Sequence, residues 1–326
     1  MIGLPFDVHA EVLGAAARLR GRLIETPLVP SSWLSAALGA EVRLKLENVQ
    51  ITGSFKARGA LNKMLLLTPA ERARGVVAAS SGNHGLGVAN AAGQLGCRAT
   101  VFVPETTPAQ KRAAIAQLGA EVVVFGPDCV DTEIHARAFA AQQGRPYVAP
   151  YNDPAVAAGQ GTVAEELLRR WPDVDVVYVA MGGGGLLGGM AGYARAVRRH
   201  IEWVACSPAT SPAMEVCVRE GRIVDVACGD TLSDSTHGGV EPGAITFELC
   251  RQLVDRWLQV DERSIAAALR GCLAHQHLLV EGAAAVAIAA ALADRQRRGR
   301  RVCVLICGGN LPWSRLQQVM AGSDGV

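Results

Sequence analysis

Short apolar runs alternate with longer stretches of mixed polarity between residues 75 and 145. The short runs are typical of strands buried on both faces, whereas the mixed stretches repeat apolar residues at helical spacing. The pattern predicts strands at 76–80, 99–104 and 121–126. It predicts helices at 83–95, 108–119 and 130–143 between and after these strands.

The alternation returns in the second half of the chain. Strands are predicted at 174–181, 202–207 and 301–307, and the first of them leads through a glycine-rich turn into a helix. The apolar run 282–293 is too short to span a bilayer and predicts a buried helix. The segment 222–243, rich in Gly and Asp, predicts a loop. Strands that alternate with helices predict an α/β fold with parallel sheets covered on both faces.

Composition narrows the class of protein. The chain has 326 residues, of which 50% are hydrophobic and 19% are charged, so we expect a globular protein with a large core, in two domains. A net charge of +2 gives no reason to expect a nucleic acid or a membrane as partner. The nine cysteines are scattered and form no CxxC pair, and the N-terminus does not resemble a signal peptide. These features favour a cytoplasmic location.

One lysine stands at the start of a predicted helix. Only four of the 32 basic residues are lysines, and Lys56 follows Phe55 in the stretch TGSFKARGA. Ser54 is the predicted N-cap, which places Lys56 in the first helical turn. The helix dipole and burial there both favour a neutral amine, the form that attacks a carbonyl group. The alternative is an ordinary surface lysine.

The stretch MGGGGLLGGM, residues 181–190, follows a buried strand and opens a helix. Glycines allow backbone N–H groups to approach an anion, so the loop predicts a phosphate site. It also contains GxGxxG, but the next strand ends at Ser207 and not at the acid that a dinucleotide site needs. No GxxxxGK motif followed by Ser or Thr is present. A smaller phosphorylated cofactor fits better, and a tight strand–helix crossing is the structural alternative.

A second turn, SSGNHGLG at 80–87, also joins a predicted strand to a helix. Its hydroxyl, amide and backbone donors can hold a carboxylate. His84 is a candidate acid or base, although a structural histidine is an equal alternative. His275 and His277 are two residues apart on a predicted helix and do not share a face, so we expect no metal site there.

Taken together, these motifs resemble those of the fold-type II pyridoxal phosphate (PLP) enzymes, and specifically threonine/serine dehydratases and serine racemase. The matching stretches are ENVQITGSFKARGALN, SSGNHGLGVA, PYNDPAVAAGQGT, MGGGGLLGG, GGVEPGAITFELC, LVEGAAAVAIAA and CGGN, in the order of the family. The resemblance implies a tryptophan synthase β-like α/β fold with two doubly wound open-sheet domains. The large PLP-binding domain would comprise residues 1–71 and 149–326, and a small inserted domain residues 72–148.

The resemblance also implies roles for individual residues. Lys56 matches the lysine that binds PLP covalently, and Ser81 matches the serine that meets the substrate carboxylate and acts as second base in the racemase. Asn83 matches the residue that contacts the 3′ oxygen of PLP, and Cys307 the position that faces the pyridine nitrogen. The expected cofactor-binding set is Phe55, Lys56, Asn83, Gly182, Gly183, Gly184, Gly185, Leu186 and Cys307. The expected substrate-binding set is Ser80, Ser81, Gly82, Asn83 and His84.

The chain departs from its metal-dependent relatives at Ser207 and Ala213, where they carry acids, so we expect no divalent metal site. No regulatory domain is evident after residue 315.

The expected activity is a PLP-dependent dehydratase that converts L-threonine, L-serine or a related β-hydroxy-α-amino acid to a 2-oxo acid and ammonia. The alternatives are a serine-type racemase, or a dehydratase for hydroxyaspartate or phenylserine. A non-enzymatic PLP-binding protein is disfavoured by the presence of Lys56 and Ser81. We expect a homodimer or a higher homo-oligomer.

Overall fold

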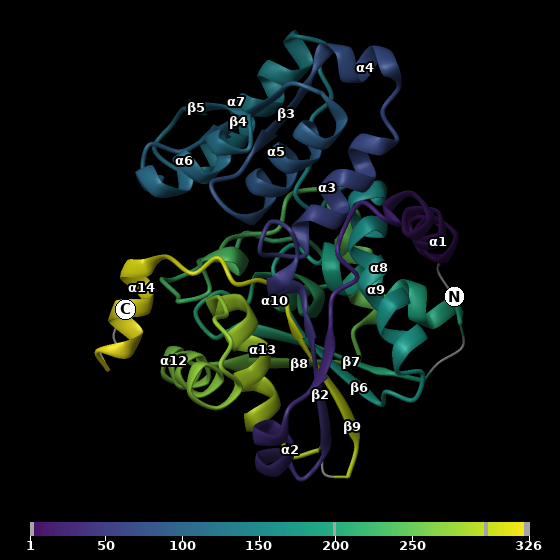
Figure 1. Cartoon of the computed structure of the whole chain (residues 1–326), viewed down its shortest axis with the longest axis vertical. Coiled ribbons are helices and arrows are strands. Elements are labelled where there is room, and N and C mark those ends of the chain that lie inside the picture. Colours follow the sequence, from purple (N-terminus) through teal and green to yellow (C-terminus); the bar gives the residue numbers. More distant parts are fainter. Residues whose placement is uncertain (1–2, 198–199, 297–298, 323–326) are drawn as a thin grey trace.

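The computed structural model describes residues 3–197, 200–296 and 299–322, and its strands form two sheets (Figure 1). The larger sheet has six strands in the order β1-β2-β9-β6-β7-β8. Its strands are β1 (Leu28–Pro30), β2 (Glu41–Leu46), β6 (Val176–Ala180), β7 (Glu202–Pro208), β8 (Arg256–Val260) and β9 (Arg301–Ile306). The smaller sheet has the order β3-β4-β5, with β3 (Val76–Ala79), β4 (Ala99–Val103) and β5 (Glu121–Val124).

Helices connect the strands and surround both sheets. They are α1 (Val8–Leu19), α2 (Ser32–Leu38), α3 (Lys56–Leu65), α4 (Pro69–Arg74), α5 (Asn83–Leu95), α6 (Ala109–Gln117), α7 (Cys129–Gln142), α8 (Pro154–Arg170), α9 (Gly185–Ala196), α10 (Ala213–Glu220), α11 (Ile245–Leu253), α12 (Glu262–Gly271), α13 (Gly282–Ala293) and α14 (Trp313–Met320). Three short elements complete the set: the 3₁₀ turns η1 (Glu47–Val49) and η2 (Asp234–Thr236), and the π-helical η3 (Cys272–Gln276).

The larger sheet is parallel except for β1, which pairs antiparallel with β2. Strand β9 lies between β2 and β6, so segments from opposite halves of the chain meet at the centre of the sheet. Every residue of β6 is buried, as the continuous apolar run predicts. Residues 282–291 of α13 are also buried, and the helix contacts β6, β7, β8 and β9. The predicted buried helix is therefore confirmed.

The smaller sheet shows how strand periodicity builds two cores. Successive side chains of a strand point to opposite faces. Val76, Ala78 and Val101 therefore pack on the α5 face, whereas Val77 and Phe102 pack on the α7 face. Helices on both faces are what a parallel sheet requires, and the strands predicted at 76–80, 99–104 and 121–126 are confirmed apart from their last one or two residues. In Figure 1 this sheet and its helices lie above the larger sheet.

A buried cluster of charged side chains links α3 to the larger sheet. Arg58 donates to Glu47 through Nε and Nη2, each at 2.8 Å, and to Glu166 through Nη1 at 2.6 Å. Lys45 forms an ion pair with the same Glu166. We define these residues, Lys45, Glu47, Arg58 and Glu166, as the buried charge cluster. It joins β2, η1, α3 and α8, and so fixes the helix that begins at Lys56 against the large sheet.

Candidate active site

Lys56 lies in the first turn of α3, as predicted, but the predicted cap is wrong and the helix begins one residue later. Phe55 occupies the N-cap position and no side chain caps the helix. Ser54 forms an isolated β-bridge with Gly308, and its buried hydroxyl has no hydrogen-bond partner among the residues that the structure describes. Phe55 N donates to the carbonyl oxygen of Cys307 at 3.1 Å. The backbone before Lys56 is thus held by the loop that follows β9, and not by a local cap.

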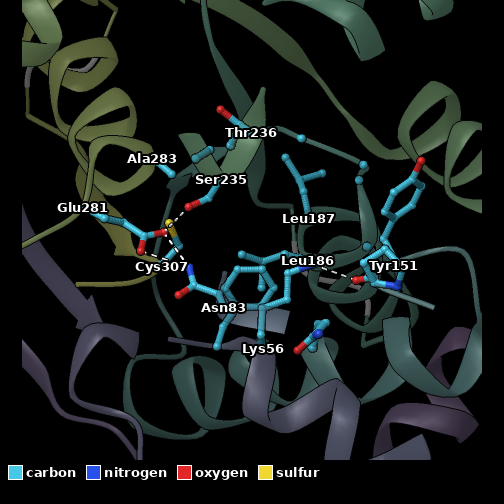
Figure 2. Close-up of a pocket in the computed structure, with 18 residues that line it drawn as sticks. Lys56, Asn83, Tyr151, Leu186, Leu187, Ser235, Thr236, Glu281, Ala283 and Cys307 are labelled. Atoms are coloured by element: carbon cyan, nitrogen blue, oxygen red, sulfur yellow. Dashed lines mark hydrogen bonds between the residues drawn. The ribbon is translucent and has the colours of Figure 1, made fainter. Parts of the chain in front are cut away.

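The Lys56 side chain points into a cavity lined also by Phe55, Asn83, Leu186 and Cys307 (Figure 2). Burial lowers the pKa of Lys56 to about 8, while the negative charge of the nearby Glu281 acts in the opposite direction. With this pKa, roughly a tenth to a fifth of Lys56 is neutral between about pH 7.0 and 7.4, so the free amine that a nucleophile or general base requires is available. This agrees with the prediction from its position in the first helical turn.

The glycine-rich loop closes one side of the same cavity. It joins β6 to α9, and all of Gly182, Gly183, Gly184, Gly185 and Leu186 line the cavity. Gly184 has φ +81°, a conformation that disfavours a side chain. At Gly183 an added Cβ would lie 2.3 Å from the Tyr151 ring. Only glycine fits at these two positions, and the start of α9 adds the positive end of a helix dipole.

The turn between β3 and α5 forms part of the wall of a second cavity, which adjoins the first. Ser80, Ser81, Gly82, Asn83 and His84 line a cavity of about 300 Å³ that Lys56 and Gly183 also line. The structure thus brings together every site residue predicted from the sequence, in two adjoining cavities that share Lys56 and Asn83. Segments from both sheets contribute to them.

His84 is placed as a structural residue. It is buried, and a ring nitrogen lies 2.8 Å from the carbonyl oxygen of Val148. Because a carbonyl only accepts, this Nε2 carries the hydrogen. Burial, and then the nearby Lys56, lower the pKa of His84 to about 3. The ring is therefore neutral at physiological pH, which favours the structural alternative over an acid–base role.

Several residues of the cavity were not predicted from the sequence. They are Pro150, Tyr151, Ser235, Thr236 and Glu281, with Asn310 beside them. The Glu281 carboxylate accepts hydrogen bonds from the side chains of Asn83 and Ser235 (Figure 2). Three of the matching sequence stretches contain Tyr151, Glu281 or Asn310, so the resemblance marked their segments without giving them a role.

Comparison with known proteins agrees with this site. Residues 19–308 match the family described as "Pyridoxal-phosphate dependent enzyme". The L-threonine ammonia-lyase of Geobacter sulfurreducens is 42% identical, over 94% of this chain and 76% of that protein. The catabolic L-threonine dehydratase of Escherichia coli K12 is 36% identical, over 96% of each chain.

A solved structure with the same fold is the processed form of threonine deaminase isoform 2 from Solanum lycopersicum. It superposes with a TM-score of 0.90 at 31% identity, covering 96% of this chain and 92% of that one. The similarity extends over nearly the whole chain and includes both sheets. The protein therefore belongs to the family of pyridoxal-phosphate dependent enzymes and has their fold-type II architecture.

Proposed function

We propose that the protein is a dehydratase for a β-hydroxy-α-amino acid, which it converts to a 2-oxo acid and ammonia. The observation that carries this proposal is the position of Lys56, a lysine with a lowered pKa that lines one cavity with the glycine loop and another with the Ser80–His84 turn. Relatives named L-threonine ammonia-lyase make L-threonine the first candidate substrate, and L-serine, which the resemblance also implies, is the second.

The cavity residues fit PLP. Lys56 is an amine able to react with its aldehyde, and the glycine loop has the close backbone approach that a phosphate group needs. Asn83 would contact the ring oxygen, and Phe55, Leu186 and the un-ionised Cys307 would border the ring. When bound, PLP supplies an electron sink for the electron pair left at Cα.

The protein side chains would bind the substrate and remove its Cα proton. Ser81 and the donors of the Ser80–His84 turn would bind the substrate carboxylate and orient Cα. Neutral Lys56 would remove the Cα proton as a general base. Loss of hydroxide from Cβ then gives an enamine, which tautomerises and hydrolyses to the 2-oxo acid and ammonia.

Racemisation is the second candidate function. Ser81 and Lys56 line the same cavity, so two proton-transfer groups are available to a single substrate. Chiral chromatography of L-serine incubations would detect D-serine if Ser81 acts as the second base. Hydroxyaspartate and phenylserine remain alternative substrates for dehydration.

The test is a 2-oxo acid assay of the purified PLP-loaded protein with L-threonine, L-serine, hydroxyaspartate and phenylserine, with Lys56→Ala as the control. We expect 2-oxo acid and ammonia in equal amounts from at least one substrate. Racemisation without 2-oxo acid would replace the dehydratase by the racemase. No turnover of any kind would reject both functions.

The finer organisation is also part of the proposal. We place residues 1–71 and 149–326 in a large domain and 72–148 in a small one, supported by the separate three-stranded sheet.

No helix in the described part of the chain is long and apolar enough to cross a membrane. We propose a cytoplasmic homodimer or higher oligomer, supported by nine free cysteines and by exposed apolar side chains such as Trp313. Light scattering after size exclusion tests the assembly, and retention of activity with a chelator tests independence from divalent metal.

A further inference from the structure

Glu281 is a buried carboxylate with neutral partners. It stands at the N-cap of α13, is 4% exposed, and does not cap its own helix. Its oxygens accept instead from the Asn83 side chain at 2.9 and 3.0 Å, from the Ser235 hydroxyl at 2.9 Å and from the Asn310 backbone N–H at 3.2 Å. Buried carboxylates usually pair with a cation, because neutral donors compensate less well for the lost hydration.

The hydrogen bonds around Glu281 favour the ionised form of its carboxyl group. Burial raises the pKa of Glu281 above its usual value, and the hydrogen bonds from Asn83, Ser235 and Asn310 limit this rise. All four contacts run toward the Glu281 oxygens, and protonation would place an O–H donor against one of these donors. An ionised Glu281 is an acceptor only, so whatever faces it must donate.

This property fixes the orientation of Asn83. The Asn83 nitrogen Nδ2 must face Glu281, and its oxygen Oδ1 accepts from Asn310 Nδ2 at 2.6 Å. Asn310 Nδ2 also donates to the Thr52 carbonyl oxygen at 2.9 Å. These hydrogen bonds form a directional chain, in which the acceptor at one end is the Glu281 carboxylate and the acceptor at the other end is the Thr52 carbonyl oxygen. The Asn83 amide therefore cannot flip without losing hydrogen bonds on both sides.

We infer that Glu281 is a positioning residue, whose carboxylate holds the Asn83 amide so that its remaining N–H is a donor toward the ring oxygen of the cofactor. This inference rests on the role proposed above for Asn83. A fixed donor stabilises the ionised ring oxygen. A glutamine at 281 can present either its oxygen or its NH₂ group, so the direction of the chain would no longer be enforced.

The absorption spectrum of the PLP-loaded protein tests this. The long-wavelength band reports the ionised ring oxygen, and the short-wavelength band the un-ionised one. In Glu281→Gln we expect intensity to move from the first band to the second. We also expect the Kd for PLP to rise about tenfold, the worth of one hydrogen bond to a charged group. A variant with the wild-type band ratio and Kd would overturn the inference.

A double-mutant cycle separates positioning from general damage. If Glu281 acts through Asn83, Glu281→Gln should change neither the band ratio nor the Kd in an Asn83→Ala background. Additive effects on both would overturn the inference. If Asn83→Ala alone changes neither quantity, the proposed role of Asn83 fails. If Asn83→Ala has an effect and Glu281→Gln has none, only the role of Glu281 fails.

Two further variants complete the design. Ser235→Ala removes one of the donors to the Glu281 carboxylate and leaves its contact with Asn83, so we expect a smaller shift of the bands than in Glu281→Gln. A shift as large as that of Glu281→Gln would contradict a specific role. Asn310→Ala removes the donor to Asn83 Oδ1 and leaves the carboxylate in place. It should shift the bands in the same direction by a smaller amount, and an unchanged spectrum would count against the directional chain even if Glu281→Gln does not fold.

Discussion

The Nζ atom of Lys56 lies 2.7 Å from the carbonyl oxygen of Pro150, to which it donates a hydrogen bond. Pro150 directly precedes Tyr151, whose ring packs against the glycine loop. A carbonyl oxygen accepts from a neutral amine as well as from a charged one, so this contact orients the lysine without requiring its charge. The amine is therefore held where it lines both cavities, the one with the glycine loop and the one with the Ser80–His84 turn.

Lys56→Ala should abolish turnover. The variant lacks both the amine that attaches PLP and the general base, and a single positioned base contributes about 10²–10⁴-fold to a rate. The 2-oxo acid assay and the absorption spectrum measure both losses. Lys63→Ala is the matched control, because Lys63 lies on the same helix and forms an ion pair with Asp153 outside the cavities. Ammonia release by Lys56→Ala at the wild-type rate would disprove the proposed mechanism.

Capture of PLP by the cofactor-free protein should depend on pH. The pKa of Lys56 is about 8, and only the neutral amine attacks the aldehyde. The rate should fall about tenfold for each pH unit below that value and level off above it. His84 contributes nothing in this range because its pKa is about 3. Stopped-flow absorbance measures the rate, and a flat profile through the pKa would show that Lys56 is not the reacting amine.

Gly184→Ala should weaken PLP binding. Its φ is +81°, and an added Cβ would lie 2.6 Å from the Cys250 sulfur, so the loop must shift. We expect a loss of affinity of at least about tenfold, because strain of this kind costs about 1–3 kcal/mol. Gly119→Ala is the control: φ is +89° but nothing lies within 4 Å of the added atom. Equal affinity of the two variants for PLP would argue against a phosphate role for the loop.

Cys307 should tolerate serine and not aspartate. Burial, and then Glu281, raise the pKa of its thiol well above the usual value, so Cys307 is neutral. Cys307→Ser should keep most of the activity. In Cys307→Asp a carboxylate would keep the pyridine nitrogen protonated and delay loss of hydroxide, and turnover should fall about tenfold or more. Because a second carboxylate beside Glu281 is costly, kcat is compared only for protein that melts cooperatively with PLP bound. Wild-type kcat in such protein would exclude control by this position.

Glu47→Gln should destabilise the fold more than it affects binding. The variant leaves Arg58 and Lys45 buried with one carboxylate partner, Glu166, and breaking a buried pair costs about 3–5 kcal/mol. Denaturant unfolding measures this cost. Glu25→Gln removes exposed ion pairs with Arg169 and Arg170 and should cost less than about 1 kcal/mol. Similar losses in the two variants would show that the buried charge cluster has no special weight.

The same cluster predicts a pH dependence. Burial raises the pKa of Glu47, but Arg58, Lys45 and Thr26 together outweigh burial, and the net pKa is lowered from 4.5. The unfolded state then binds more protons than the folded state as the pH falls below 4.5, so this part of the stability is present above 4.5 and lost below it. Acid unfolding of Glu47→Gln should show a weaker dependence on pH in that range.

The apolar pattern was enough to predict most helices and strands, because the buried face of an element determines which of its own residues are apolar. The strand at 76–79 and the helix at 83–95 follow directly from the apolar pattern. The cap at Ser54 was wrong because its backbone pairs with Gly308, some 250 positions away, and such tertiary pairing has no local signal. Lys45 and Glu47, in the stretch RLKLEN, look like polar residues of an exposed strand, yet both are fully buried by partners from α3 and α8.

The site residues also fall into two groups, those with a local sequence signal and those that depend on tertiary contacts. Lys56 and the glycine loop were predictable because helix starts and glycine runs have chemistry of their own. Glu281 precedes an alanine-rich helix, where an acid ordinarily serves the helix dipole. Only the fold brings Asn83, Ser235 and Asn310 around it, so its contact with the cavity could not be read from its neighbours in sequence.

The pairing of β2 with β9 has a consequence for synthesis on the ribosome. Residues 41–46 leave the ribosome long before residues 301–306, so the centre of the larger sheet cannot close until nearly the whole chain has been translated. The strands β3, β4 and β5 are contiguous in sequence and can pair early. During elongation the edge of β2 that pairs with β9 therefore stays unpaired, and this nascent chain needs protection against aggregation more than one with locally paired strands.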